Sequence, residues 1–537
     1  RFGLTKSNEQ MKKFRSPFNT EFNSQADIAN KGSYEERNTQ NLNYDGDFSL
    51  TYGKLFNEKH MVNVVGGMRL SQNGSNNSAY KVQGFIDDEF SNPAFALGYQ
   101  KDGNATYQDS KKRAVSYYLN FGYAYDDRYL LDVNYRSDGS SVFGSDRQFT
   151  NTWSVGLGWN IHKEAFFSDI EGISLLKLRA SIGNPGNQNF DDYISTRIYS
   201  YNTDNMNIFG SSAIVSNLGN RNLEWQKTLD RNIGFDIIFL DNRLRVNFDY
   251  FNKRTDPLLV QIGTASSTGV KTLPRNVGKQ ITEGITLTMN YSIIRREDMF
   301  WSVNMNLRHQ TSEYKEVSEV LTKYNLDNRN RNLTRYYDGG SPSDLWAVRS
   351  CGIDPATGRE IFLDKNGEQT FVHNYDDEVV VGNSDPKVEG VIGTSFYYKG
   401  FSASINLRYR LGGQIFMQTL YDKVENLSSS KKWENLDKRA LYDRWKQPGD
   451  QAKFKSIASS EVTPISSRFV EDNNVLSGES ISLGYESTAP WLKHIGASSM
   501  SVRAYMNDIF RISTVKNERG LSYPFARSVS FSLGVTF

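Results

Sequence analysis

The last ten residues of the chain, Ser528-Val-Ser-Phe-Ser-Leu-Gly-Val-Thr-Phe537, decide the fold class. Small polar residues alternate there with apolar ones, which are Val529, Phe531, Leu533, Val535 and Phe537. Successive side chains of a β-strand point to opposite faces, so this period of two predicts a strand with one apolar face and one polar face. The chain ends where the strand ends.

The same period recurs toward the amino terminus. In 401–411, six apolar residues from Phe401 to Leu411 alternate with Ser, Asn and Arg. About fifteen such strands are predicted, and many approach the ~9 to 11 residues with which a tilted strand crosses a bilayer. They cover 48–55, 61–70, 115–125, 129–137, 153–161, 174–183, 231–239, 244–250, 285–293, 301–307, 388–398, 401–411, 476–487, 498–507 and 528–537. The pattern predicts an all-β protein, a transmembrane antiparallel β-barrel.

Composition excludes several other classes. Lys and Arg number 63 against 61 Asp and Glu, so charge does not favour a nucleic-acid partner. Cys351 is the single cysteine and the five histidines are scattered, which argues against a disulfide framework, a zinc cluster or another metal centre. Mean hydropathy is −0.59 and no apolar run is long enough for a membrane helix. The 30 Tyr and 32 Phe suit the aromatic girdles of a membrane barrel.

The connections between strands alternate in length, as in membrane barrels with short periplasmic turns and long outer loops. Short turns fall at 126–128, 241–243, 295–298 and 399–400, and long polar stretches at 71–112, 184–223, 311–386 and 412–474. Counting back from Phe537, the strand near Phe48 runs inward. Residues 1–43 are therefore expected to be an extracellular loop region, and 44–537 the carboxyl-terminal portion of the barrel. An odd number of strands cannot close in the even pattern of bacterial barrels, so the missing strands are expected before Arg1, either in a second chain or in an unseen part of this one.

Several stretches, in this order, carry a resemblance to a known family. They are 123–131 (YAYDDRYLL), 136–144 (RSDGSSVFG), 183–189 (GNPGNQN), 222–228 (NLEWQKT), 352–358 (GIDPATG), 364–367 (DKNG), 385–387 (DPK), 398–401 (YKGF), 444–450 (RWKQPGD), 467–472 (SRFVED) and the terminal Phe537. Together they resemble the SusC/RagA-type TonB-linked outer-membrane transporters of the Bacteroidota.

The resemblance implies a barrel of about 22 strands around a plug domain. It also implies coupling to TonB, a SusD-like surface lipoprotein as a lid, and import of oligosaccharides or oligopeptides across the outer membrane of a Gram-negative cell. The chain departs from the pattern twice: it contains neither plug nor TonB box, and Ser477–Ser480 stands where similar proteins tend to carry a basic, apolar stretch.

The alternating residues Val529, Phe531, Leu533, Val535 and Phe537 resemble the terminal signal by which barrel proteins are recognised for assembly in the outer membrane. An ordinary last strand is the alternative. Because no tail follows Phe537 in the sequence, we favour the signal.

Aromatic side chains of the long loops are candidate contacts for a substrate or a lid, because flat apolar faces with polar edges suit both sugars and peptides. They are Tyr336, Tyr337, Trp346, Trp433, Tyr442 and Trp445. Packing within the loops is the alternative, and for any single residue it is the favoured one. The segment from Trp433 to Trp445 is predicted as a short helix that ends before Pro448.

Basic residues on polar strand faces are expected to project into the lumen. They are Lys177, Arg179, Arg308, Arg408 and Arg410. They could select an anionic substrate or contact the plug, and plug contact is favoured because a filled lumen must satisfy many polar groups.

The stretch from Gly352 to Gly367 is predicted as a small hairpin with turns at Asp354-Pro355 and at Lys365-Asn366-Gly367. A calcium loop is the alternative, since Asp354, Asp364 and Glu368 supply oxygens, but their spacing does not fit the twelve-residue loop of an EF-hand. Turn chemistry is therefore favoured.

No catalytic motif, phosphate loop or paired metal-ligand histidines occur, so neither an enzyme nor a cofactor is expected. The leading hypothesis is an active importer. A passive channel or a surface receptor with the same barrel is the main alternative, and a soluble β-sandwich that binds glycans is the alternative from another class.

Overall fold

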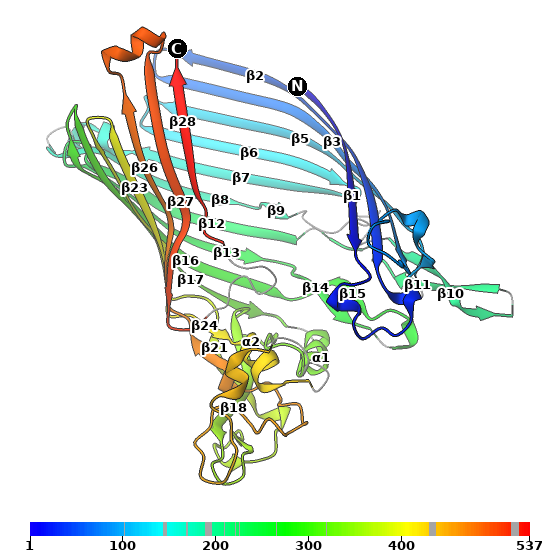
Figure 1. Ribbon diagram of the computed structural model, residues 1–537. Coiled ribbons are helices and arrows are strands. Elements are labelled where there is room, and N and C mark those ends of the chain that lie inside the picture. Colours follow the sequence, from blue (N-terminus) through cyan, green and yellow to red (C-terminus); the bar gives the residue numbers. More distant parts are fainter. Residues whose placement is uncertain are drawn as a thin grey trace.

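A computed structural model describes the chain except residues 101–102, 143–147, 168–169, 188–195, 209, 221, 225, 265, 318, 429–435 and 517–525. Its dominant element is an eighteen-stranded sheet that curves around a hollow (Figure 1). Strands that follow one another along the sheet pair antiparallel. The all-β prediction is confirmed.

Each of the fifteen predicted strands overlaps one long strand of this sheet. The long strands are β1 (Phe2–Arg15), β2 (Ser33–Phe56), β3 (His60–Gln83), β5 (Thr106–Tyr125), β6 (Tyr129–Ser140), β7 (Phe149–Asn160), β8 (Ile173–Gly183), β12 (Gln226–Phe239), β13 (Leu244–Thr255), β16 (Lys279–Arg295), β17 (Met299–Lys315), β22 (Val388–Tyr398), β23 (Phe401–Leu411), β26 (Val475–Ser487), β27 (Ser499–Ser513) and β28 (Val529–Thr536). Two short strands, β4 (Gly98–Tyr99) and β9 (Gly186–Asn187), complete the sheet.

The prediction of a loop region over 1–43 is wrong, because β1 and the first part of β2 are strands. They pair without a break from Phe2 opposite Gly46 to Arg15 opposite Ser33. The period-two signal is absent there because Asn, Gln, Lys and Glu occupy both faces, and the ladder of backbone hydrogen bonds carries the pairing. The odd strand count came from missing β1, so the parity argument for further strands fails.

The strands β2 and β3 have 24 residues each, which at ~3.3 Å per residue is far longer than a bilayer crossing. Most exposed apolar side chains of β2, including Phe48, Leu50 and Tyr52, lie in the half that leads into the short turn to β3. The other half, rich in Asn, Gln and Ser, therefore extends beyond the hydrocarbon.

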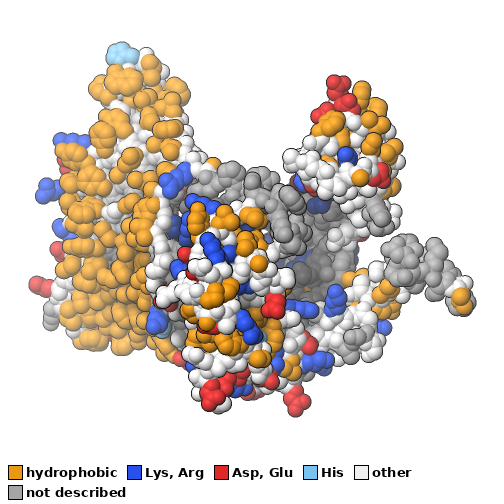
Figure 2. All heavy atoms as spheres, turned by 60° about the horizontal axis from the view of Figure 1, so that its bottom comes forward, with side chains coloured by type: hydrophobic (Ala, Val, Ile, Leu, Met, Phe, Trp, Pro, Cys, Tyr) orange, Lys and Arg blue, Asp and Glu red, His pale blue; other side chains and the backbone are white. Residues whose placement is uncertain are grey.

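The apolar face of the sheet points away from the protein. Phe531 is 76% exposed and Leu533 68% exposed, whereas a compact soluble core would bury them. Figure 2 shows hydrophobic side chains covering this outer surface. No helix among the described residues has the length and hydrophobicity to cross a membrane.

Two long connections fold into one body, here called the loop unit, comprising residues 344–383 and 413–474. A four-stranded sheet is formed by β18 (Asp344–Ile353), β19 (Glu360–Leu363), β20 (Gln369–Thr370) and β21 (Glu378–Asn383). The second connection adds β24 (Gln414–Phe416), α2 (Gln418–Leu420) and β25 (Val470–Asp472), packed around Val424, Phe454 and Phe469. The loop unit lies at the end of the sheet opposite the carboxyl terminus (Figure 1).

Other connections form smaller elements. They are the helix α1 (Glu319–Asn328) and the hairpins β10–β11 (Ile198–Asn207, Gly210–Asn217) and β14–β15 (Leu259–Gly263, Thr272–Asn276). α1 contacts β14, and Leu321 of α1 is buried in the same apolar cluster as Leu258 and Tyr314.

Candidate functional site

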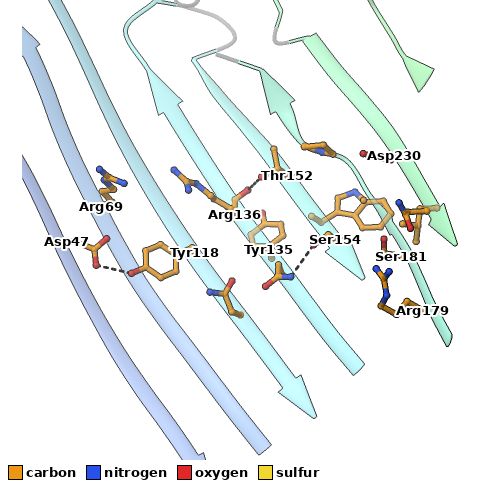
Figure 3. Close-up of a pocket in the computed structure, with 17 residues that line it drawn as sticks. Asp47, Arg69, Tyr118, Tyr135, Arg136, Thr152, Ser154, Arg179, Ser181 and Asp230 are labelled. Carbon is orange, nitrogen blue, oxygen red and sulfur yellow. Dashed lines mark hydrogen bonds between the residues drawn. The ribbon is translucent and has the colours of Figure 1, made fainter. Parts of the chain in front are cut away.

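The concave face of the sheet carries a polar cavity of about 740 Å³. Arg69, Arg136 and Arg179 reach it from three different strands, and Asp47 and Asp230 add carboxylates (Figure 3). Tyr118 donates its hydroxyl proton to Asp47 across 3.0 Å. Since these residues alternate with the outward apolar ones, strand periodicity alone places a charged, hydrogen-bonding surface on the inner wall.

Arg136 is held by its neighbours on the wall. Its guanidinium lies 2.6 Å from the Asp138 carboxylate and donates to the Ser116 hydroxyl at 2.9 Å, and Ser116 in turn donates to Asp138. Asp138 is buried, so this triad fixes the arginine in one orientation.

Arg179 bridges two strands of the wall. Its guanidinium lies 2.9 Å from Asp236 of β12 and 3.1 Å from Asp249 of β13. Gly234 stands opposite both Arg179 and Asp249 in the register, and a side chain there would overlap the Asp249 carboxylate. The absence of a side chain at Gly234 is what lets the arginine reach across β12.

Arg408 and Arg410 are also neutralised within the wall. Arg408 lies 3.1 Å from Glu479, and Arg410 lies 3.4 Å from Glu389. Glu479 is the extra residue of β26 in its pairing with β23, where Ser480 stands opposite Asn406 and Gly478 opposite Leu407. The departure from the family pattern at 477–480 thus places an acid beside Arg408.

The other two predicted wall cations have different surroundings. Arg308 donates to Gln310 at 2.5 Å and lies over the Phe251 ring, 6.0 Å from its centroid. Lys177 stands opposite Asp236 in the register of β8 and β12. The structure therefore does not gather the five predicted cations into one cluster; it distributes them along the wall.

Three of the candidate aromatic residues pack against other parts of the protein. Tyr336 lies 5.0 Å from Tyr314 and 5.3 Å from Tyr324, measured between ring centroids, and burial raises its pKa. Trp346 packs against Tyr337 at 4.7 Å. Trp445 donates its indole N–H to the Pro355 carbonyl at 2.9 Å.

Tyr337 and Tyr442 keep exposed faces, and Tyr442 is 62% exposed. Trp433 lies outside the described residues. The predicted helix from Trp433 to Trp445 is wrong for its described part, which forms a short 3-10 helix over Lys438–Leu441 and is then extended at Tyr442. The 3-10 turn is capped by the Asp437 side chain, which accepts from the Arg439 backbone N–H.

The predicted hairpin is confirmed, and its acidic residues serve the turns. β18 pairs with β19, and β19 with β20. Asp354 accepts from the Thr357 hydroxyl at 2.6 Å and from two backbone N–H groups, and these bonds, the hydroxyl first, lower the pKa of Asp354. Asp364 accepts from the backbone of Asn366 and Glu368. Among the described residues, no three His, Cys, Asp or Glu side chains converge as a metal site.

A buried ion cluster inside the loop unit is absent from the sequence predictions. Arg468 lies 2.9 Å from Glu360 and 2.6 Å from Glu425, and none of the three side chains is more than 9% exposed. Ser466 donates to Glu360, and Thr463 to Glu425. Burial alone would lower the pKa of Arg468, but the two carboxylates outweigh it and raise that pKa.

A second buried pair joins Arg335 to Glu378, through two nitrogens at 2.9 and 2.7 Å. Partners in both clusters are tens of residues apart or more, so no local pattern marks them. Arg468 does lie in the 467–472 stretch that resembles the family, but that resemblance gives no hint of its carboxylate partners.

Comparison with known proteins gives concordant findings. A family model described as TonB dependent receptor-like, β-barrel matches residues 3–430. TonB-dependent receptor P39 of Formosa agariphila is 26% identical over 91% of this chain and 51% of its own length. TonB-dependent receptor SusC of Bacteroides thetaiotaomicron is 25% identical over 80% of this chain and 44% of its own. The chain spans about half the length of the curated relatives it matches.

The fold is similar to that of a solved RagAB peptide transporter. The TM-score is 0.81 with 19% identity, and the match covers 96% of this chain and 56% of the other. At this identity the match concerns the fold.

Proposed function

The chain belongs to the family of TonB dependent receptor-like β-barrels, and from that premise we propose that it forms much of the wall of an active outer-membrane importer. It is an outer-membrane protein of the SusC/RagA type, and this family consists of receptors and transporters rather than enzymes. In the proposed cycle, substrate enters from outside near the loop unit, and TonB moves a plug in the lumen to release the substrate inward.

One observation carries the proposal: a single curved sheet has an apolar, exposed outer face and a charged, hydrogen-bonding inner face with a large cavity. That combination suits a wall between lipid and an aqueous passage. The ion pairs of Arg179, Arg408 and Arg410 neutralise part of the charge of the inner face and leave that face polar.

The proposed substrates are oligosaccharides or oligopeptides, and the proposed lid is a SusD-like lipoprotein. The proposal draws on a relative named TonB-dependent receptor SusC and on a protein of similar fold whose complex is described as a peptide transporter. Of the predicted aromatic contacts, Tyr337 and Tyr442 have the exposure that a lid or substrate contact requires.

The sheet has two open edges among the described residues, where β1 pairs only with β2, and β28 only with β27. Unpaired backbone groups in hydrocarbon cost several kcal/mol each, so we infer that further strands close the wall between β28 and β1. A plug and a TonB box belong to the same proposal. Recognition of Val529, Phe531, Leu533, Val535 and Phe537 for membrane assembly is proposed on the exposure of that face.

The test is uptake by cells that make the full-length receptor, with and without functional TonB. Glycan and peptide pools are first compared for binding to the purified receptor and its lid, and the pool that binds is then used for uptake. An active importer loses uptake when TonB is inactivated but keeps binding. Unchanged uptake without TonB would support the passive channel instead.

A further inference from the structure

A second cavity lies near the short turns, at the end of the lumen opposite the loop unit. Its volume is about 360 Å³, and its lining contains three arginines, Arg243, Arg245 and Arg295. The other lining residues are Ile238, Asn242, Asn290 and Ser292. Among the described residues no carboxylate lines it, although Asp241 and Glu297 are near in sequence.

The register brings the three arginines together on neighbouring strands. Arg245 on β13 stands opposite Asn290 on β16, and the Arg243 carbonyl accepts from the Ser292 N–H at 2.8 Å. Arg295 ends β16, three residues beyond Ser292. Three consecutive residues with positive φ, from Leu240 to Asn242, make the tight turn that leads into Arg243.

The cavity opens on the lumen side of the wall. Arg245 and Asp249 are four residues apart on β13 and so share a face, and Asp249 is the lumenal partner of Arg179. The alternate residues Leu244, Val246 and Tyr250 belong to the outer, apolar face. The arginines therefore face the lumen, whereas a lipid headgroup would lie on the outer face of the sheet.

Several other lumenal cations lie beside a carboxylate of the wall. Arg179, Arg408, Arg410 and Lys253 each lie within 3.4 Å of a wall carboxylate. Arg243, Arg245 and Arg295 make no ion pair with any described residue. Many wall cations are thus neutralised by a neighbouring carboxylate, whereas these three arginines lie together around one cavity without one among the described residues.

We propose that Arg243, Arg245 and Arg295 form an oxyanion site at the periplasmic mouth of the lumen, occupied by a carboxylate of the polypeptide that fills the lumen. The planar guanidinium donates paired N–H groups that match a carboxylate, and three in one cavity can hold one or two acidic side chains. The Asn290 amide and the Ser292 hydroxyl complete a polar lining. The site would hold the periplasmic end of this polypeptide, here called the filling segment, where its release from the wall must begin. This inference rests on the proposed plug.

The test is hydrogen–deuterium exchange on the purified full-length receptor. The variants are R243Q/R245Q/R295Q and the corresponding triple Glu variant, and heat-modifiable migration on gels checks that each barrel is folded. We expect exchange at least about tenfold faster in an acid-containing segment outside the barrel strands, because the loss of even one charged hydrogen bond of this kind shifts an opening equilibrium by about that factor. The Glu variant should exceed the Gln variant because it adds repulsion.

Arg128→Gln is the matched control, since Arg128 lies in another short turn but pairs with Asp126 at 2.5 Å. It should leave exchange of the filling segment unchanged. Equal exchange in the wild type and both triple variants would overturn the proposal. So would binding of added inorganic phosphate to the wild-type receptor in an arginine-dependent manner, because the site would then be open to a free anion. Neither readout uses uptake, so failure here is distinct from failure of TonB-dependent import.

Discussion

The wall and the loop unit hold their charges in opposite ways. On the wall, Arg179 and its two aspartates are each between 21% and 34% exposed, and the pairs follow from which residues face the lumen. In the loop unit, Arg468 and its two glutamates are nearly or fully buried, and they come from three separate segments. The alternation of residues along the strands therefore places the charges of the wall. In the loop unit, the buried ion pairs themselves help to hold the three segments together.

This difference has an energetic consequence. An exposed ion pair contributes about 0 to 1 kcal/mol, while removal of one partner from a buried pair costs about 3 to 5 kcal/mol because an uncompensated charge stays behind. The wall should tolerate loss of an ion pair, and the loop unit should not.

The largest effect is expected for Arg468→Met. The substitution removes the cation that pairs with both Glu360 and Glu425, so the loop unit should lose about 3 kcal/mol, which corresponds to roughly a hundredfold loss of amide protection. Hydrogen exchange of residues 344–383 measures this loss. Arg410→Met is the control, because Arg410 and Glu389 are 44% and 35% exposed, and it should cost at most about 1 kcal/mol. Equal losses in the two variants would contradict the comparison.

The next effect tests a position of the wall that has no room for a side chain. In Gly234→Ala, the new methyl group would overlap the Asp249 carboxylate and the Phe248 carbonyl, so Arg179 could no longer bridge to β13. Overpacking of this kind costs about 1 to 3 kcal/mol, to be measured as the denaturant midpoint of the barrel in detergent. Gly156→Ala is the control, since the nearest atom to its new methyl group is 3.8 Å away. A wild-type midpoint for Gly234→Ala would show that the bridge is unimportant.

The wall can be predicted from the sequence better than the loop unit, because the charges of the wall follow from strand periodicity. A lipid-facing side chain at every second position is a local pattern, so fifteen strands and the lumenal placement of Arg179, Arg408 and Arg410 could be derived from it. β1 was missed because both of its faces are polar. The Arg468 cluster depends on contacts between residues 43 and 108 positions apart, which no local pattern records.

A smaller effect is expected from pH, and again it concerns the loop unit. Burial lowers the pKa of His373, whose ring packs against Phe362 and Tyr375. The folded state then binds fewer protons than the unfolded one, so stability is complete above the unfolded pKa of about 6.5 and falls as the pH drops below it. The loss should be at most about 1.4 kcal/mol per pH unit. Proteolysis rates of the loop unit at pH 7.5 and 5.5 measure it.

His373→Gln should remove most of this slope. His494→Gln is the control, because His494 is exposed and lies outside the loop unit. A slope that persists in His373→Gln would assign the pH dependence to other groups.

The smallest effect on stability is expected for Tyr442→Ala. This variant distinguishes a packing role of Tyr442 within the loop unit from a contact with a lid or substrate. Tyr442 is 62% exposed, so its loss should change the stability of the loop unit by no more than about 0.5 kcal/mol. Trp445 is the matched contrast three residues away: it donates to Pro355 and its ring covers Gly358, so Trp445→Ala should cost clearly more. If Tyr442→Ala keeps the loop unit intact and weakens binding of the lid or substrate, Tyr442 is a contact residue. If binding is also unchanged, the aromatic-contact hypothesis fails at the position where exposure favours it most, and a stable loop unit would then recognise its partner through polar groups.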